Sequence, residues 1–234
     1  LKLYGFKGRK NVFLGTVHSF CISEILSKFI DVYDYGINMP IKIIPQKLEQ
    51  QILNDVKTDL GITEKITKVD IDKERALNVN GQSQVLVHSN PTANSIAREY
   101  ENRLLAAGYI DYQGIITLST QIIQDHEYVR KCISARFPWI VIDEYQDLGK
   151  PLHEMVMSLF TTTDIKVFAV GDPDQSIYGF SGAIPDYLME LYNREDTIPV
   201  ELKNNYRSNQ DIVNGSELVL GLERHYKAKT RDQD

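Results

Sequence analysis

Residues 139–147 have the sequence WIVIDEYQD, in which four apolar side chains are followed at once by an aspartate and a glutamate. A continuous apolar run of this kind is typical of a strand that is buried on both faces of a parallel sheet. A second run, Ile165–Val170, ends in Gly171-Asp172, and a third strand is predicted at about Ile198–Leu202. The sequence therefore predicts buried parallel strands, two of which are followed directly by polar residues.

Helical patterns separate these strands, and one more strand is predicted before them at Val12–Val17. Pro151 begins a segment with apolar side chains at the spacing of an amphipathic helix, and another helix is predicted from about Pro185. Ser208 can cap a final helix that runs to Leu220. Alternating strands and helices indicate an α/β fold with a parallel sheet, which binds ligands at the carboxyl ends of its strands.

The segment from about residue 22 to residue 135 is predicted to be helical. Ser19 is a candidate N-cap for its first helix. Further helices are predicted over residues 45–61, 91–108 and 111–124, whereas residues 62–90 are polar and are expected to be irregular. Because this segment separates the first strand from the others, we interpret it as an insertion into the α/β domain.

The composition is that of an ordinary globular protein. The 234 residues include 26 basic and 32 acidic side chains, a net charge of −6, and 42% are apolar, which excludes collagen-like and wholly disordered chains. Cys21 and Cys132 are too few for a disulfide scaffold, and no apolar run reaches the length of a membrane span. We therefore expect a cytoplasmic protein with no membrane partner. The net acidity disfavours bulk attraction to nucleic acid, although basic residues cluster at 7–10, 130–136 and 203–207.

Asp143 and Glu144 are suited to nucleotide hydrolysis. An aspartate at the end of a buried strand can hold Mg²⁺ between the β- and γ-phosphates, and the next carboxylate can orient and deprotonate the attacking water. Buried strands also end in acidic residues simply because loops are solvated. The pair alone therefore leaves both interpretations open.

The sequence GDPDQSIYGFSGA, residues 171–183, follows the second strand. Gln175 lies on this loop beside the predicted carboxylates, where it can sense a γ-phosphate. Tyr178 and Phe180 can provide rings on which nucleobases stack. The alternative is that both rings belong to the core.

Two further segments carry side chains suited to phosphates and bases. In LKNNYRSN, Tyr206 can stack on a nucleobase and Arg207 can stabilise charge on phosphoryl oxygens, unless the arginine simply pairs with a surface carboxylate. In GTVHSF, Thr16, His18 and Ser19 stand at a strand-to-helix junction, where hydroxyl and free N–H groups can bind phosphate oxygens. A plain N-cap and an ordinary loop histidine are the alternatives.

In this order and spacing, these strings resemble motifs of the UvrD/Rep-type DNA helicases of superfamily one. GTVHSF resembles motif Ib, DEYQD motif II, GDPDQSIYGFSGA motif III and NNYRS motif IV, and Ile110-Asp111-Tyr112 resembles the Asp-Phe segment before motif II. The resemblance implies a partial RecA-like (P-loop NTPase) parallel sheet with an inserted all-helical subdomain. It assigns residues 1–21 and 136–199 to RecA-like domain 1A, residues 22–135 to helical subdomain 1B, and residues 200–234 to the start of domain 2A.

The resemblance also implies roles in the nucleotide site. Asp143 would help to hold Mg²⁺, and Glu144 would be the general base for ATP hydrolysis. Gln175 would couple the γ-phosphate to the DNA site. Tyr206 would stack on adenine, and Arg207 would contact the γ-phosphate.

Along the DNA, the resemblance implies that Phe180 stacks on the single strand with Tyr178 nearby, while Thr16 and His18 lie along its backbone. We therefore predict an ATP-dependent helicase or translocase that moves 3′ to 5′ and uses ATP and Mg²⁺. Its expected partners are single-stranded and partly duplex DNA, and repair or nuclease proteins. The processes it would serve are DNA repair, replication or recombination.

The sequence departs from the family in several places. The phosphate-binding loop Gly-x-x-x-x-Gly-Lys-[Ser/Thr] is absent, Ser181 stands where most relatives have arginine, Leu148-Gly149 replaces Thr-Asn, and Gly114 stands where an acidic residue is common. Because the chain begins at Leu1 and lacks that loop, we interpret it as an internal piece of a helicase and expect it to be inactive by itself. The alternative is a non-catalytic helicase-like module that binds single-stranded DNA or a partner protein.

Overall fold

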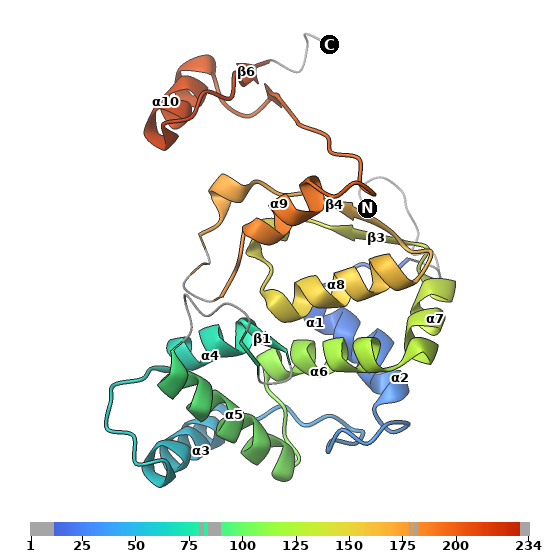
Figure 1. Ribbon diagram of the computed structural model, residues 1–234, viewed down its shortest axis with the longest axis vertical. Helices are drawn as coiled ribbons and strands as arrows, with labels where there is room; N and C mark the ends of the chain where they lie inside the picture. The colour runs from blue at the N-terminus through green and yellow to red at the C-terminus, as the bar shows by residue number, and fades with distance from the viewer. Residues whose placement is uncertain (1–11, 80–81, 84–89, 178, 180–181, 230–234) are drawn as a thin grey trace. The chain divides into compact units, whose positions relative to one another are not determined.

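The computed structural model describes residues 12–79, 82–83, 90–177, 179 and 182–229. The chain divides into two compact units, residues 1–190 and 191–234. The helices of the first unit are α1 (Val17–Phe20), the π-helical η2 (Cys21–Leu26), α2 (Ser27–Phe29), α3 (Gln46–Asp59), α4 (Lys68–Ala76), α5 (Pro91–Ala106), α6 (Tyr112–Asp125), α7 (Glu127–Arg136), the 3₁₀ turn η4 (Tyr145–Asp147), α8 (Lys150–Thr162), the 3₁₀ turn η5 (Pro173–Gln175) and most of α9 (Asp186–Tyr192) (Figure 1). Its strands are β1 (Asn78–Val79), β2 (Gln82–Ser83), β3 (Trp139–Ile142) and β4 (Lys166–Ala169).

Strands β3 and β4 form the parallel pair that the apolar runs predict. Their register places Trp139 beside Lys166 and Ile142 beside Ala169, and α8 connects the two strands. The prediction of burial on both faces is wrong for the described residues. Trp139, Val141 and Phe168 are 57%, 70% and 56% exposed, because the helices cover only the opposite face.

The helices that cover the sheet share one core. Buried side chains of η2, α6, α7 and α8 form a single apolar cluster, and Ile140 and Val167 of the sheet pack against it. Helix α6 lies alongside α8, as Figure 1 shows. Ile25, Ile122 and Leu159 of these helices are fully buried in the cluster. The β3–β4 pair, with its carboxyl ends, therefore packs on an apolar core.

A second apolar cluster lies between α3, α4 and α5, which are grouped together in Figure 1. It includes Val56 of α3, Ile71 of α4, and Ile96 and Tyr100 of α5, all fully buried. The fold therefore carries a helical cluster of its own within the segment that the sequence predicts to be helical. The boundaries 22–135 stay a prediction.

The unit of residues 191–234 contains β5 (Asn204–Asn205), α10 (Gln210–Leu220) and β6 (Lys227–Ala228). Strands β5 and β6 are parallel, with α10 between them along the chain. The N-cap of α10 is Asn209, whose Oδ1 accepts the N–H of Ile212 at 3.0 Å, so the prediction of a Ser208 cap is wrong by one residue.

Two of the predicted strands are absent from the described residues. Residues 12–16 are irregular, and α1 begins at Val17. Residues 198–202 form no strand, and Ile198 and Leu202 are 92% and 78% exposed. A strand needs a neighbour for its N–H and C=O groups, and neither segment pairs with a described strand.

The segment 62–90, predicted to be irregular, contains α4 and the β1–β2 hairpin. A capping box begins α4: the Asp70 N–H donates to Thr67 Oγ1, and the Thr67 N–H donates to Asp70 Oδ2. Thr16 plays the same capping role for α1, where its Oγ1 accepts the N–H of Ser19, so Ser19 is not the cap. Side chains spaced by three residues at a helix start are the signal that identifies both caps.

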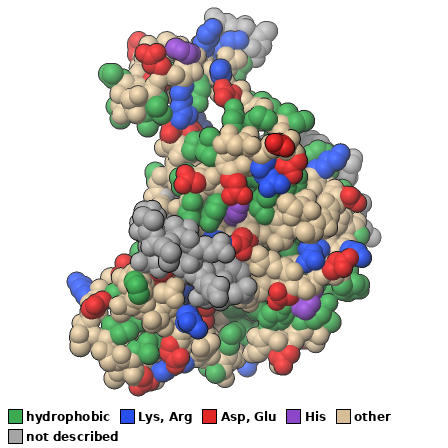
Figure 2. Space-filling model, in the orientation of Figure 1, with side chains coloured by type: hydrophobic (Ala, Val, Ile, Leu, Met, Phe, Trp, Pro, Cys, Tyr) green, Lys and Arg blue, Asp and Glu red, His purple; other side chains and the backbone are tan. Residues whose placement is uncertain are grey.

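The basic cluster predicted at 130–136 lies on α7, where two of its three basic side chains form ion pairs and Arg130 donates to the carbonyls of Ile123 and Gln124. Lys131 forms an ion pair with Glu127 at 2.7 Å, and Arg136 forms one with Glu24 at 3.3 Å. Figure 2 shows basic and acidic side chains interspersed over the visible face of the molecule.

Candidate functional site

The DEYQD and GDPDQ segments meet at one edge of the β3–β4 sheet. The Val170 N–H donates to Ile142 C=O at 2.9 Å, and the Tyr145 N–H donates to Val170 C=O at 2.9 Å. Because the strands are parallel and in register, their carboxyl ends coincide. The structure therefore brings Asp143 and Glu144 to the same edge as the loop that begins at Gly171.

Glu144 leaves the strand in a left-handed conformation, with φ 54° and ψ 45°. This region is uncommon for residues other than glycine and often marks a functional site. Asp143 Oδ1 accepts the Glu144 N–H at 3.0 Å, and Glu144 C=O accepts the Asp147 N–H at 3.0 Å. The turn exposes both carboxylates, those of Asp143 and Glu144, to solvent.

Gln146 is a site residue that our sequence analysis missed. Its side chain is 1% exposed; Nε2 donates to Glu144 Oε2 at 2.8 Å, and Oε1 accepts the Asp172 N–H at 3.1 Å. Gln175 is exposed on the adjacent turn, where its Nε2 donates to Asp172 Oδ2 at 2.9 Å. The sequence signal that could have identified Gln146 was its place as a polar residue within the DEYQD motif. Its partner on the second loop, Asp172, is determined by the tertiary packing.

A buried tyrosine connects the DEYQD turn to helix α8. The Tyr145 side chain is fully buried, and its hydroxyl is 3.0 Å from His153 Nδ1 on α8. The His153 ring stacks on Tyr187, with ring centroids 4.1 Å apart, and its Nε2 is 3.4 Å from Glu190 Oε2. Burial raises the pKa of Tyr145, so the phenol stays neutral at any physiological pH.

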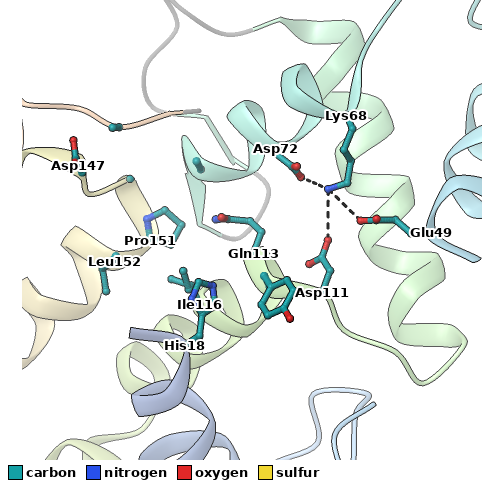
Figure 3. A pocket seen from close by; sticks show the side chains of 14 residues that line it. His18, Glu49, Lys68, Asp72, Asp111, Gln113, Ile116, Asp147, Pro151 and Leu152 are labelled. Carbon is teal, nitrogen blue, oxygen red and sulfur yellow. Dashed lines mark hydrogen bonds and ion pairs between the residues drawn. The ribbon is translucent and has the colours of Figure 1, made fainter. Parts of the chain in front are cut away.

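His18 lies on the wall of a cavity of about 570 Å³ (Figure 3). Its ring contacts Tyr112 edge-on, with centroids 5.4 Å apart. Asp147, the last residue of DEYQD, lines the same cavity. Within the described residues its Oδ1 is buried without a hydrogen-bond partner, and burial followed by the charge of Glu144 raises the pKa of Asp147. Thr16, by contrast, is exposed and engaged in capping α1.

Charged residues of three helices close the other side of this cavity. Lys68 forms ion pairs with Asp72, with Glu49 at 3.3 Å and with Asp111 at 3.9 Å, as the dashed lines in Figure 3 mark. Burial alone would raise the pKa of Asp111, but the charge and hydrogen bonds of Arg75 outweigh it and hold that pKa at about 2. The carboxylate of Asp111 is therefore ionised and fully engaged in structure.

The other predicted site residues are two nucleotide contacts, Tyr206 and Arg207, and two aromatic DNA contacts, Tyr178 and Phe180. Tyr206 is 43% exposed and Arg207 is exposed in the unit of residues 191–234. Asn205 Oδ1 shapes their turn by accepting the N–H of Arg207 at 2.9 Å. Tyr178 and Phe180 lie outside the described residues.

Comparison with known proteins agrees with the motifs on this sheet edge. Residues 2–196 match the UvrD/REP helicase N-terminal domain family. The chain belongs to this family. Membership implies a RecA-like fold, consistent with the parallel β3–β4 pair and its helices.

Relatives of this UvrD/REP domain include several proteins named as helicases. The chain is 32% identical over 127 residues to ATP-dependent DNA helicase Rep of Escherichia coli, covering 54% of this chain and 19% of the relative. It is 27% identical over 237 residues to ATP-dependent DNA helicase UvrD1 of Mycobacterium tuberculosis, covering 93% and 30%. It is 40% identical over 102 residues to Gabija protein GajB of Bacillus cereus, covering 43% and 21%.

This chain spans about a third or less of the length of each of these relatives. Among the helices of its described part, none is both long enough and apolar enough to cross a bilayer.

Proposed function

We propose that this chain belongs to the motor of an ATP-driven DNA helicase or translocase. The observation that carries the proposal is the contact of two family motifs at one sheet edge, where the Tyr145 N–H donates to Val170 C=O. This edge is where α/β folds bind ligands. The relatives named as ATP-dependent DNA helicases support the same activity.

Glu144 is the general base in this proposal. Its carboxylate is exposed at the end of β3 and accepts a hydrogen bond from Gln146, so it is accessible from solvent at this edge. Such a group can take the proton of a water that attacks the γ-phosphate. Gln175, on the adjacent turn, responds to the presence of that phosphate and couples it to the DNA site.

Asp143 is the proposed ligand of Mg²⁺. Nucleotide-bound Mg²⁺ takes one or two carboxylates besides phosphate oxygens and water, rather than a cage of protein ligands. Asp143 suits this mode, because it is a single carboxylate exposed at the end of β3. Bound Mg²⁺ would neutralise charge on the phosphates.

Tyr206 and Arg207 complete the nucleotide contacts in the proposal. Tyr206 stacks on adenine, and Arg207, permanently charged and planar, contacts the γ-phosphate. Both side chains lie in a turn that Asn205 shapes, with the arginine exposed.

For DNA, we propose that Phe180 and Tyr178 stack on bases while Thr16 and His18 follow the backbone. The protein would move 3′ to 5′ on single-stranded DNA and separate strands of partly duplex DNA. The processes served would be repair, replication or recombination, with repair or nuclease proteins as partners.

The substitution Glu144→Gln in the full-length protein tests this function. It should abolish DNA-stimulated ATP turnover and leave ATP binding intact, because the amide fills the same space and cannot accept the proton of the attacking water. Glu127→Gln is the matched control, since Glu127 is exposed on α7 and pairs only with Lys131 among the described ion pairs. Undiminished hydrolysis by the Glu144→Gln protein would remove Glu144 from the mechanism.

The second candidate is a non-catalytic module that binds single-stranded DNA or a partner protein. The absence of a Gly-x-x-x-x-Gly-Lys-[Ser/Thr] string from these 234 residues favours it. For the same reason we propose that the chain by itself does not hydrolyse ATP. Steady single-strand-stimulated turnover by the purified 234-residue chain would contradict that.

A further inference from the structure

Gln146 joins the two loops of the proposed ATP site through one buried carboxamide. Its Nε2 donates to Glu144 Oε2 at 2.8 Å, and its Oε1 accepts the Asp172 N–H at 3.1 Å. The orientation of the amide follows from its partners, because a carboxylate only accepts and a backbone N–H only donates. At 1% exposure, the Gln146 carboxamide itself is closed to water, so it depends on these two partners.

The absence of a side chain at Gly171 leaves room for the Gln146 carboxamide. A Cβ atom at Gly171 would lie 2.5 Å from Gln146 Oε1, closer than two such atoms can approach. Gly171 therefore provides space for the carboxamide. The main-chain carbonyl of Gln146 also accepts a hydrogen bond from Ser176 Oγ at 3.4 Å, so the same residue contacts the GDPDQ loop twice.

The two bonds connect a strained residue to a neighbouring loop. Glu144 is held in the left-handed region, which needs support from its surroundings. Asp172, at the other end of the link, accepts the Gln175 side chain and caps η5. Gln146 therefore links the loop after β4 directly to the Glu144 carboxylate.

We propose that Gln146 is a positioning residue, which holds the Glu144 carboxylate in place and makes it move together with the Asp172–Gln175 turn. The inference rests on the proposed function, in which Glu144 is the general base. Gln146 touches neither ATP nor the attacking water in this view. Its loss should therefore lower kcat for ATP hydrolysis and change KM for ATP little.

Two substitutions in the full-length protein separate the two bonds. Gln146→Met keeps the length of the side chain and loses both bonds. Gln146→Glu keeps an acceptor for the Asp172 N–H but cannot donate to Glu144 when ionised. Both should lower kcat by about 10- to 100-fold, the effect of a small misplacement of a catalytic group.

Amide hydrogen exchange gives a readout that does not depend on activity. The Asp172 amide should exchange faster in Gln146→Met than in the wild type, and should stay protected in Gln146→Glu. Gly171→Ala keeps the glutamine but displaces its carboxamide, so it should repeat the Gln146→Met result in both assays. If Gln146→Met fails to fold, Gly171→Ala and Gln146→Glu carry the test.

Gln124→Met is the matched control. Gln124 Nε2 donates to Glu154 Oε2 at 2.8 Å between α6 and α8, a Gln–Glu contact of the same kind elsewhere in the fold. This variant should keep kcat within about twofold of the wild type. Equal losses in Gln124→Met and Gln146→Met would mean general destabilisation and would overturn the proposal.

The outcomes also distinguish this proposal from the function on which it rests. An active wild type that loses turnover with Glu144→Gln, while Gln146→Met keeps its kcat, overturns the role of Gln146 alone. A rise in KM with unchanged kcat does the same, because it would mean a part in ATP binding. If the wild type itself does not hydrolyse ATP, the proposed function fails, and unchanged exchange of the Asp172 amide would separately refute the link.

Discussion

Arg75 on α4 and Asp111 at the start of α6 form a bidentate ion pair that is almost closed to water. Arg75 Nη2 is 2.7 Å from Asp111 Oδ1, Nη1 contacts Oδ2, and the two residues are 3% and 5% exposed. The same carboxylate accepts the Tyr100 hydroxyl at 3.1 Å and the Gly114 N–H at 2.8 Å, which caps α6. One side chain thus links the helical cluster of α3, α4 and α5 to the helix that packs against α8.

The substitution Asp111→Asn should destabilise the fold. It removes the bidentate partner of the buried Arg75 guanidinium, which keeps its pairs with Glu101 at 2.8 Å and with Asp72 at 3.4 Å. Removing one member of a buried ion pair costs up to about 3 kcal/mol when part of the charge stays compensated. Equilibrium urea unfolding of the 234-residue chain at pH 7 measures the change. The control is Asp59→Asn, which removes the 2.8 Å pair with Arg103, where the Asp59 side chain is 60% exposed. Equal losses in the two variants would contradict the structural role of Asp111.

The same carboxylate predicts an acid limit to stability. Its pKa is about 2 in the folded chain against an ordinary value of 3.8, so the unfolded chain binds the proton more readily. The contribution of Asp111 is therefore complete above about pH 4 and is lost as the pH falls towards 2. The free energy of unfolding should decrease over this interval, and less steeply in Asp111→Asn. Identical slopes in the two proteins would show that Asp111 is not the responsible group.

The β3–β4 pair should open more easily than the helical cluster. Among the described strands β3 pairs only with β4, and one face of the pair is exposed, whereas α3 packs through Leu53 and Val56 on a buried cluster. In native-state hydrogen exchange of the 234-residue chain, amides of residues 140–142 and 167–170 should lose protection before those of 50–59. Equal protection would mean that the sheet is as stable as the helices.

Phe180→Ala in the full-length protein tests the predicted DNA contact. Stacking of a base on an aromatic ring contributes about 1–3 kcal/mol, so the affinity for single-stranded DNA should fall by about tenfold or more. Fluorescence anisotropy with a labelled oligonucleotide measures it. Phe168→Ala is a suitable comparison, because Phe168 is an exposed ring on the outer face of β4. Unchanged affinity and unchanged DNA-stimulated ATP turnover in Phe180→Ala would assign that ring to the core.

Much of the fold could be predicted because it depends on local pattern. The apolar runs at 139–142 and 165–170 predict a parallel pair, and Pro91 and Pro151 predict two helix starts, each within a residue of the observed one. The predictions failed where a pattern needs a partner. Residues 198–202 are as apolar as a strand, yet no described strand lies beside them.

Family membership and the candidate residues at the strand ends were determined by the sequence alone, since motif order is a property of the chain. The tertiary structure decided the partners of polar side chains. Arg75 lies 36 residues from Asp111 and Gln146 lies 26 from Asp172, and nothing local to either member names the other. Most buried polar groups are satisfied by a donor or acceptor that the packing brings within about 3 Å, so those contacts exist only once the helices and strands have come together.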